Sequence, residues 1–138
     1  MKELLFGTVR MNSVVGDLGL LVLRVFAGLS LMYAHGLGKF PPSERFIEGV
    51  AAMGFPLPVL FGWAAALSEV VGGICLALGL ATRPSSFFIM CTMATAAFIR
   101  HAPDPYRAKE LPLLFLATAF LFLCTGAGRF AVDRFLRK

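Results

Sequence analysis

Two charged residues, Arg24 and Glu69, lie inside the most apolar stretches of this sequence. A charged side chain at the centre of a membrane helix costs about 2.5–3.5 kcal/mol on insertion scales. Opposite charges offset much of this cost when they pair, so we predict that Arg24 and Glu69 form a buried polar pair. Such a pair either holds the helices together without chemistry or serves as a proton route or ligand contact.

A second group of ionisable residues lies where the apolar stretches end. His35 and His101 close the first and third stretches, and Lys39 and Glu110 lie near the same level. These side chains can hydrogen-bond a quinone carbonyl and exchange protons with a bound molecule, and two imidazoles can also ligate a haem or metal. Alternatively, each His is an interfacial residue at a helix end. The four residues are our candidate ligand-binding group.

Motifs for other chemistry are missing from the sequence. It has no phosphate-cradling glycine loop, no HExxH, no GxSxG and no dinucleotide fingerprint. Its three cysteines have neither a CxxC nor a metal-ligand spacing, so we expect no metal site. We expect no intrinsic cofactor, and the four candidate residues His35, Lys39, His101 and Glu110 make quinone a possible bound molecule. The sequence leaves enzyme activity undecided; a chain without a flavin, haem or iron–sulfur motif would act as a subunit of a quinone-linked oxidoreductase.

The composition points to lipid as the surrounding phase. Of the 138 residues, 58% are hydrophobic, and the mean hydropathy is +0.79. A soluble domain of this length buries only about two thirds of its unfolded surface, which is too little for so many apolar side chains. The net charge of +5 comes from basic residues at the ends of apolar stretches and in the C-terminal tail. This placement is typical of membrane topology, so we expect no nucleic-acid partner.

Four apolar stretches are candidates for membrane-spanning helices, which need about 20 residues each. We therefore predict an all-α membrane protein in a single domain, residues 1–138, built as a bundle of four transmembrane helices. The predicted spans are residues 18–35, 59–81, 84–99 and 111–125.

A short amphipathic interfacial helix is predicted between spans one and two. Pro41-Pro42-Ser43 opens it, and Phe46, Ile47 and Val50 lie on one face while the other face is charged. A helix with this pattern lies in the plane of the membrane interface.

Small residues indicate how spans one and two pack. Gly28 lies beside Arg24 on the first span, and Gly73 shares a face of the second span with Glu69. Small residues on facing sides let membrane helices approach closely. His35 follows Arg24 by eleven residues, which returns to nearly the same helix face, so we predict that His35 points inward.

The distribution of Lys and Arg predicts the topology. Seven of these residues fall on the side of the two termini and five on the opposite side. The positive-inside rule then favours a multi-pass protein of the inner (cytoplasmic) membrane with both termini cytoplasmic. The tail, residues 129–138, carries Phe130 and Phe135 among basic residues, which is typical of a segment on an anionic membrane surface.

Several of these residues occur in an order that resembles the DoxX family of small four-span membrane proteins. The resemblance covers about residues 18–133, and Ala127 departs from the Gly-Pro-Gly that the family often has there. The matching residues are Arg24 with Gly28, His35-Gly36-Leu37-Gly38-Lys39-Phe40, Glu69 with Gly72-Gly73, Leu78-Gly79-Leu80-Ala81-Thr82-Arg83, His101, and Gly126-Ala127-Gly128-Arg129 with Asp133.

The resemblance implies a role in membrane redox chemistry. Members of the family include the membrane subunit of a thiosulfate:quinone oxidoreductase and a component of a thiol- and superoxide-handling membrane complex. By analogy, the chain is expected to be a membrane subunit of a redox-linked complex that binds quinone or a similar amphipathic molecule and works with a partner oxidoreductase or other membrane subunit. The alternatives are a non-catalytic scaffold or anchor for partner proteins and a small transporter or channel, and a homo-oligomer stays open.

Overall fold

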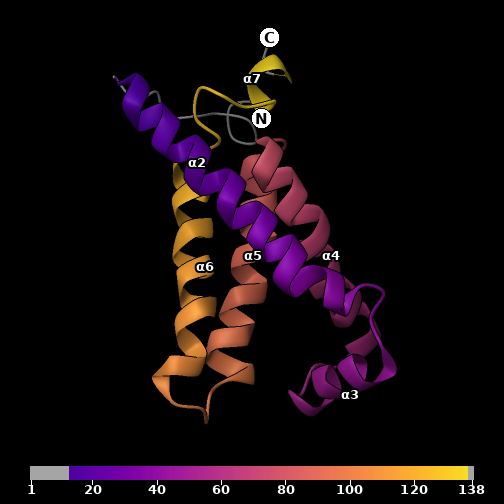
Figure 1. Cartoon of the computed structure of the whole chain (residues 1–138). Coiled ribbons are helices and arrows are strands. Elements are labelled where there is room, and N and C mark those ends of the chain that lie inside the picture. Colours follow the sequence, from indigo (N-terminus) through magenta and orange to yellow (C-terminus); the bar gives the residue numbers. More distant parts are fainter. Residues whose placement is uncertain (1–12, 137–138) are drawn as a thin grey trace.

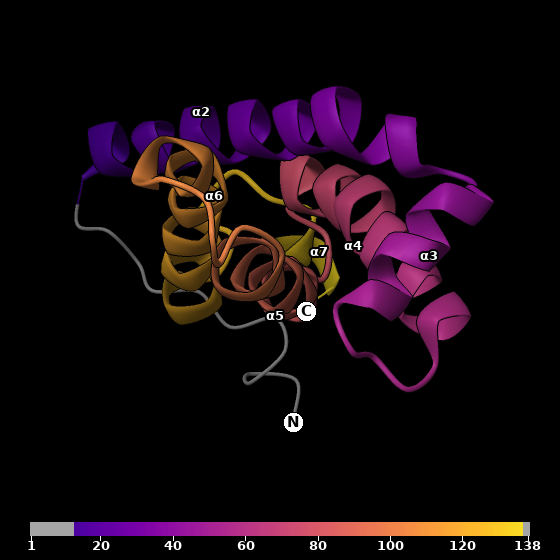
Figure 2. The same ribbon diagram turned by 90° about the horizontal axis from the view of Figure 1, so that it is seen from below.

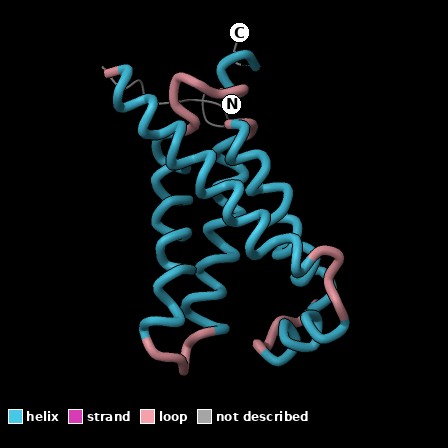
Figure 3. The backbone as a smooth tube through the Cα atoms, viewed as in Figure 1, coloured by secondary structure: helices cyan, strands magenta, loops and turns pink. Residues whose placement is uncertain are grey.

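The computed structural model describes residues 13–136, and every regular element in this range is a helix (Figures 1 and 3). Of the residues counted for the topology, Lys2, Arg10, Arg137 and Lys138 lie outside this range. The elements are α2 (Val14–Ser30), the π-helical turn η1 (Leu31–Gly36), the 3₁₀ turn η2 (Leu37–Lys39), α3 (Glu44–Ala52), α4 (Pro58–Leu78), α5 (Thr82–Thr95), the π-helical turn η3 (Ala96–Arg100), α6 (Tyr106–Thr125) and α7 (Asp133–Leu136).

Among the described residues, three helical stretches are long and apolar enough to cross a membrane. These stretches are Val14–Lys39, Pro58–Leu78 and Tyr106–Thr125. The predicted third span, over α5 and η3, is not among them. The three stretches expose large apolar side chains along their outer faces, as expected for helices surrounded by lipid.

Helices α2, α5 and α6 begin before the predicted spans, whereas α4 ends at Leu78, three residues before the predicted end of span two. α6 begins at Tyr106, five residues before the predicted span, and its polar first turn lies outside that span. Hydropathy marks where lipid contact begins, whereas Pro105 at the N-cap marks where the helix begins. Pro112 lies within α6 and does not end it, since membrane helices tolerate proline.

The long helices form a bundle in which α5 lies between α4 and α6, and α2 crosses obliquely and packs on α4 (Figures 1 and 2). The start of α2 and α7 lie at one end of the bundle, here named the terminal end. α3 and the loop between η3 and α6 lie at the other end, here named the mouth end. The buried apolar core takes side chains from all four long helical stretches: Leu31, Leu76, Ile89, Met93, Ala119 and Phe122.

Glycines allow α2 and α4 to touch through their backbones. A Cβ placed on Gly28 would lie 2.5 Å from the carbonyl oxygen of Gly73, and a Cβ on Gly73 would lie 2.7 Å from that of Gly28. No side chain fits in such a contact. The predicted close approach of these two helices through Gly28 and Gly73 is therefore confirmed.

The predicted helix between the first two spans is present as α3. The hydroxyl of Ser43 accepts a hydrogen bond from the Phe46 amide at 3.3 Å and caps the helix. Val50 is buried, and the side chains of Phe46 and Ile47 lie over Gly62 of α4. The apolar face of α3 thus packs against the mouth end of α4.

Replacement of Gly28 by alanine should lower the melting temperature in mild detergent. The added methyl would overlap the Gly73 carbonyl, which outweighs the roughly 1 kcal/mol that alanine gains over glycine in a helix. Gly19→Ala on the same helix is the matched control, because nothing lies within 4 Å of its Cβ position. That variant should be as stable as the wild type or more so. Equal melting temperatures for both variants would contradict the backbone contact.

Candidate functional site

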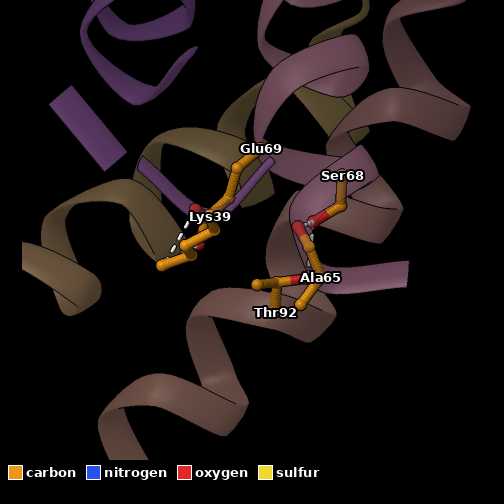
Figure 4. A network of polar contacts seen from close by, with 5 residues as sticks. All are labelled: Lys39, Ala65, Ser68, Glu69 and Thr92. Atoms are coloured by element: carbon orange, nitrogen blue, oxygen red, sulfur yellow. Dashed lines mark hydrogen bonds and ion pairs between the residues drawn. The ribbon is translucent and has the colours of Figure 1, made fainter. Parts of the chain in front are cut away.

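An ion pair joins the mouth end of span one to the middle of α4 (Figure 4). The ammonium of Lys39 donates to both carboxylate oxygens of Glu69, at 2.6 and 2.8 Å. The Glu69 side chain is 1% exposed, whereas that of Lys39 is 34% exposed. The carboxylate is therefore enclosed by protein, and the ammonium connects it to the surface.

Arg24 does not pair with Glu69, so that prediction is wrong. Its guanidinium donates instead to the carbonyl oxygens of Ala127 and Phe130, at 2.8 and 2.7 Å. Arg24 lies against Gly79, which is ten residues and about 15 Å along α4 from Glu69. Helical side chains lean toward the N-terminus of their own helix, so in antiparallel helices Arg24 and Glu69 lean toward opposite ends of the bundle. Each charge is neutralised or solvated separately.

A close approach of the backbones positions Lys39 beside Glu69. A Cβ on Gly36 would lie 2.8 Å from the Val70 side chain and 3.0 Å from the carbonyl carbon of Glu69. Glycine at this position lets the end of span one lie directly on α4. Lys39 follows three residues later, within reach of the carboxylate.

The two π-helical turns lie just before the mouth end, one containing His35 and one ending before His101. A π turn inserts an extra residue into the helix, which rotates the following side chains by up to about 100°. The eleven-residue spacing from Arg24 to His35 therefore does not place the two on one face. Such turns frequently occur at functional sites in proteins.

His35 is half-buried and faces α6. Its ring packs edge-on against Phe115, with the centroids 5.8 Å apart and an interplanar angle of 77°. Neither ring nitrogen has a hydrogen-bond partner within residues 13–136. The imidazole therefore keeps one hydrogen-bond donor and one acceptor available.

His101 and Glu110 take other positions at the mouth end. Nδ1 of His101 lies 2.7 Å from Oδ2 of Asp104, so this imidazole binds a carboxylate of its own loop. Glu110 is exposed in the first turns of α6. In the described part of the chain, no hydrogen bond or ion pair joins the four candidate ligand-binding residues to one another. These residues are His35, Lys39, His101 and Glu110. The structure brings Lys39 together with Glu69 instead.

An aromatic ring lies near the ion pair, and a pair of hydroxyl groups joins α4 to α5 at the residue before Glu69. The Lys39 ammonium lies 5.9 Å from the centroid of the Phe46 ring, a distance at which a cation is attracted to the ring face. Ser68 precedes Glu69, and its hydroxyl lies 2.6 Å from that of Thr92 (Figure 4). The same hydroxyl donates a hydrogen bond to the carbonyl oxygen of Ala65 at 2.9 Å. The contact between Ser68 and Thr92 joins α4 to α5. This contact was not predicted from the sequence, although hydroxyl residues within apolar spans are the signal for such interhelical bonds.

A second polar cluster, at the terminal end, is structural. The carboxylate of Asp133 accepts hydrogen bonds from the amides of Ala81 and Thr82, at 2.6 and 2.9 Å, and so caps the start of α5. Asp17 accepts from the Arg129 amide at 3.3 Å. These residues, with Arg24, fix the chain segment that follows α6. The glycines around Ala127 were the sequence signal for a turn, but nothing local indicated its acceptors.

The profile of the DoxX family matches residues 19–102, which is more than half of the chain. This chain belongs to the DoxX family. The matched region contains Arg24, His35, Lys39, Glu69 and His101. Together with the three apolar helical stretches, this membership makes the chain a multi-pass membrane protein.

Known DoxX-like proteins resemble the chain over most of its length. CatD of Bacillus subtilis, provisionally named an oxidoreductase, is 31% identical over 88% of this chain and 90% of its own length. The inner membrane protein YqjF of Escherichia coli is 29% identical over 88% and 95%, respectively. The inner membrane protein YphA of the same organism is 30% identical over 83% and 89%. No solved structure matches the chain at a significant level.

A double-mutant cycle should detect the ion pair of this DoxX protein. Glu69→Gln and Lys39→Met should each lower stability, because each leaves one charge of the pair without its partner. The double variant should lose about 1–2 kcal/mol less stability than the sum of the two single losses. This coupling is smaller than the roughly 3–5 kcal/mol lost when a fully buried pair is broken, because Lys39 is partly exposed. Thermal denaturation in mild detergent measures all four forms.

A second cycle provides the control. Arg24→Leu combined with Glu69→Gln should be additive, because these residues have separate partners. Coupling between Arg24 and Glu69 without coupling between Lys39 and Glu69 would contradict the arrangement described here.

Proposed function

We propose that this protein is a membrane subunit of a redox-linked complex and binds a quinone, or a similar amphipathic molecule, at the mouth end. The observation that carries the proposal is the Lys39–Glu69 pair, in which the carboxylate is buried and the lysine side chain is partly exposed. Ionisable residues inside membrane helices are functional by default, because they are costly to retain. The provisional naming of CatD as an oxidoreductase supports the same class of function.

The ammonium of Lys39 supplies the hydrogen bond that a quinone carbonyl needs. An ammonium has three N–H donors, and two of them are directed at the Glu69 oxygens, so one is left for a ligand. His35 precedes Lys39 by four residues, and its ring nitrogens are unpartnered within the described chain. A quinone head group beside them would contact two groups that can also donate protons.

Reduction of a quinone to a quinol consumes two electrons and two protons. The residues at the mouth end hold protons but carry no electrons, so the electrons come from a partner oxidoreductase with its own redox group. In this proposal, the DoxX chain provides the lipid-embedded quinone site, and the partner provides the electron donor. The protons enter through the exposed side of Lys39.

We also propose that α5 with η3 is the fourth span. Residues 82–100 are nineteen in number and rise about 28 Å, close to the roughly 30 Å of a bilayer core. Ser85 and Ser86 lower the hydropathy of this stretch but are buried, while Phe87 and Phe88 are exposed to lipid. In this arrangement α3 lies in the membrane interface, both termini are cytoplasmic, and the membrane is the inner membrane, as in the names of YqjF and YphA.

Reporter insertions test the four-span arrangement. Reporters after Gly54 and after Pro103 should report the same, non-cytoplasmic side, and a reporter after Lys138 should report the cytoplasm. With three spans, α5 would not cross, and the reporters after Gly54 and Pro103 would fall on opposite sides. That result would overturn the fourth span without affecting the ion pair.

Quinone binding tests the proposed site directly. A short-chain benzoquinone should bind the purified protein, and Lys39→Met combined with Glu69→Gln should weaken binding about tenfold or more. The loss reflects a hydrogen bond from a charged donor, worth about 1.5–3 kcal/mol, and the double substitution avoids an unpaired carboxylate. Lys109→Met is the matched control, because this second lysine of the mouth end donates to the carbonyl oxygen of Ala102, in the loop before α6, at 2.8 Å.

The same assay separates the alternative functions. Equal quinone binding by the wild type and the Lys39/Glu69 variant would remove this pair from the site. Absence of binding by every form, together with a stable partner protein in the purified complex, would favour the scaffold. His35→Ala should also weaken quinone binding. Unchanged binding by this variant would remove the imidazole from the site.

A further inference from the structure

The segment after α6 forms a groove at the terminal end, away from the mouth end. The groove has a volume of about 530 Å³ and is lined by Leu78 of α4 and by residues 129–135 apart from Asp133. The segment follows Thr125, the last residue of a stretch apolar enough to cross a membrane. It therefore lies where a bilayer's hydrocarbon core gives way to lipid headgroups.

The groove is held in a defined shape by buried contacts. Arg24 binds the carbonyl oxygens of Ala127 and Phe130, and its side chain is almost completely buried. The amide of Asp133 donates to the Gly79 carbonyl at 2.8 Å, and its carboxylate caps α5. A segment fixed in this way can bind a ligand without first losing conformational freedom.

Two arginines of the groove have no acceptor for their charge. Arg129 and Arg134 are exposed, and within residues 13–136 neither guanidinium has a hydrogen-bond or ion-pair partner. The neighbouring carboxylates are already engaged, since Asp133 caps α5 and Asp17 accepts from the Arg129 amide. The groove therefore presents uncompensated positive charge.

Exposed aromatic residues lie next to these arginines. Phe130 and Phe135 line the groove and are 42% and 73% exposed. Exposure of these rings to water is unfavourable in free energy, whereas contact with acyl chains at the edge of a bilayer is favourable. Positive charge beside apolar rings matches a ligand that has an anionic head and an apolar tail.

We propose that this groove binds an anionic phospholipid, with Arg129 and Arg134 on the phosphate and Phe130 and Phe135 on the acyl chains. Guanidinium groups fit phosphate oxygens through paired hydrogen bonds, so these arginines suit a phosphodiester. The site is separate from the proposed quinone site, which lies at the opposite end of the bundle. Failure of either proposal leaves the other intact.

Lipid-dependent stability of the purified full-length protein tests this inference. Phosphatidylglycerol added to the detergent solution should raise the melting temperature, whereas phosphatidylcholine at the same concentration should not. R129Q/R134Q should bind phosphatidylglycerol roughly fivefold more weakly for each arginine removed, because each arginine near an anionic lipid surface contributes about 1 kcal/mol. The count of phosphatidylglycerol molecules bound per protein, from native mass spectrometry, should fall accordingly.

The control removes the same charge from the other end. R100Q/R107Q replaces two exposed arginines of the mouth end and should leave the response to phosphatidylglycerol unchanged. Glycerol phosphate, which has the anion without acyl chains, should not raise the melting temperature. Equal responses of the two double variants, or equal effects of phosphatidylglycerol and phosphatidylcholine, would overturn the proposal. Stabilisation by glycerol phosphate alone would assign the groove to a soluble phosphate instead.

Discussion

A guanidinium inside an apolar bundle must find hydrogen-bond acceptors within the protein, and this constraint organises the terminal end. Arg24 finds two backbone carbonyls in the segment that follows α6, at 2.8 and 2.7 Å. Because that segment is held down, Asp133 lies at the start of α5 and supplies the cap that no residue of α5 provides. The side chain of Arg24, from the middle of α2, thereby supports two other parts of the chain. These are the segment after α6 and the first turn of α5.

The polar groups of this DoxX chain divide into two clusters with different character. At the terminal end, most partners of the charged side chains are backbone atoms, which do not titrate and suit a structural role. At the mouth end, Glu69 and Lys39 are both ionisable, and Lys39 is partly exposed. Between the clusters lies an apolar core that includes Leu31, Leu76 and Phe122. The apolar core therefore separates Glu69 from the terminal end, and its partly exposed partner Lys39 lies on the mouth side.

Much of the fold could be predicted from the sequence because membrane insertion leaves strong local signals. Apolar length located the helices, the amphipathic pattern located α3, and Gly28 with Gly73 located a helix contact. The partner of Glu69 could not be found in the same way. That prediction paired the two intramembrane charges because their signs are opposite, whereas side-chain lean and the π turn before Lys39 decided the pairing.

Long-range backbone acceptors leave no mark in a sequence. The contact between Arg24 and Ala127 spans 103 positions, and any residue type has a carbonyl oxygen to offer. The glycines beside Ala127 indicated a turn, but the direction of that turn follows from packing. Asp133 was likewise recognisable only as part of a family pattern, and its role as the cap of α5 required the fold.

The two glycine contacts between span one and α4 have a mechanical consequence. Gly28 and Gly36 touch α4 at points eight residues, about 12 Å, apart. Two such points fix both the position and the angle of one rod on another, so span one and α4 move as one rigid body. Lys39 and Glu69 belong to this same body, and their geometry survives any sliding of α5 and α6. A ligand bound at the proposed site beside this pair would therefore require no rearrangement of span one against α4, and its own loss of freedom would dominate the entropy of binding.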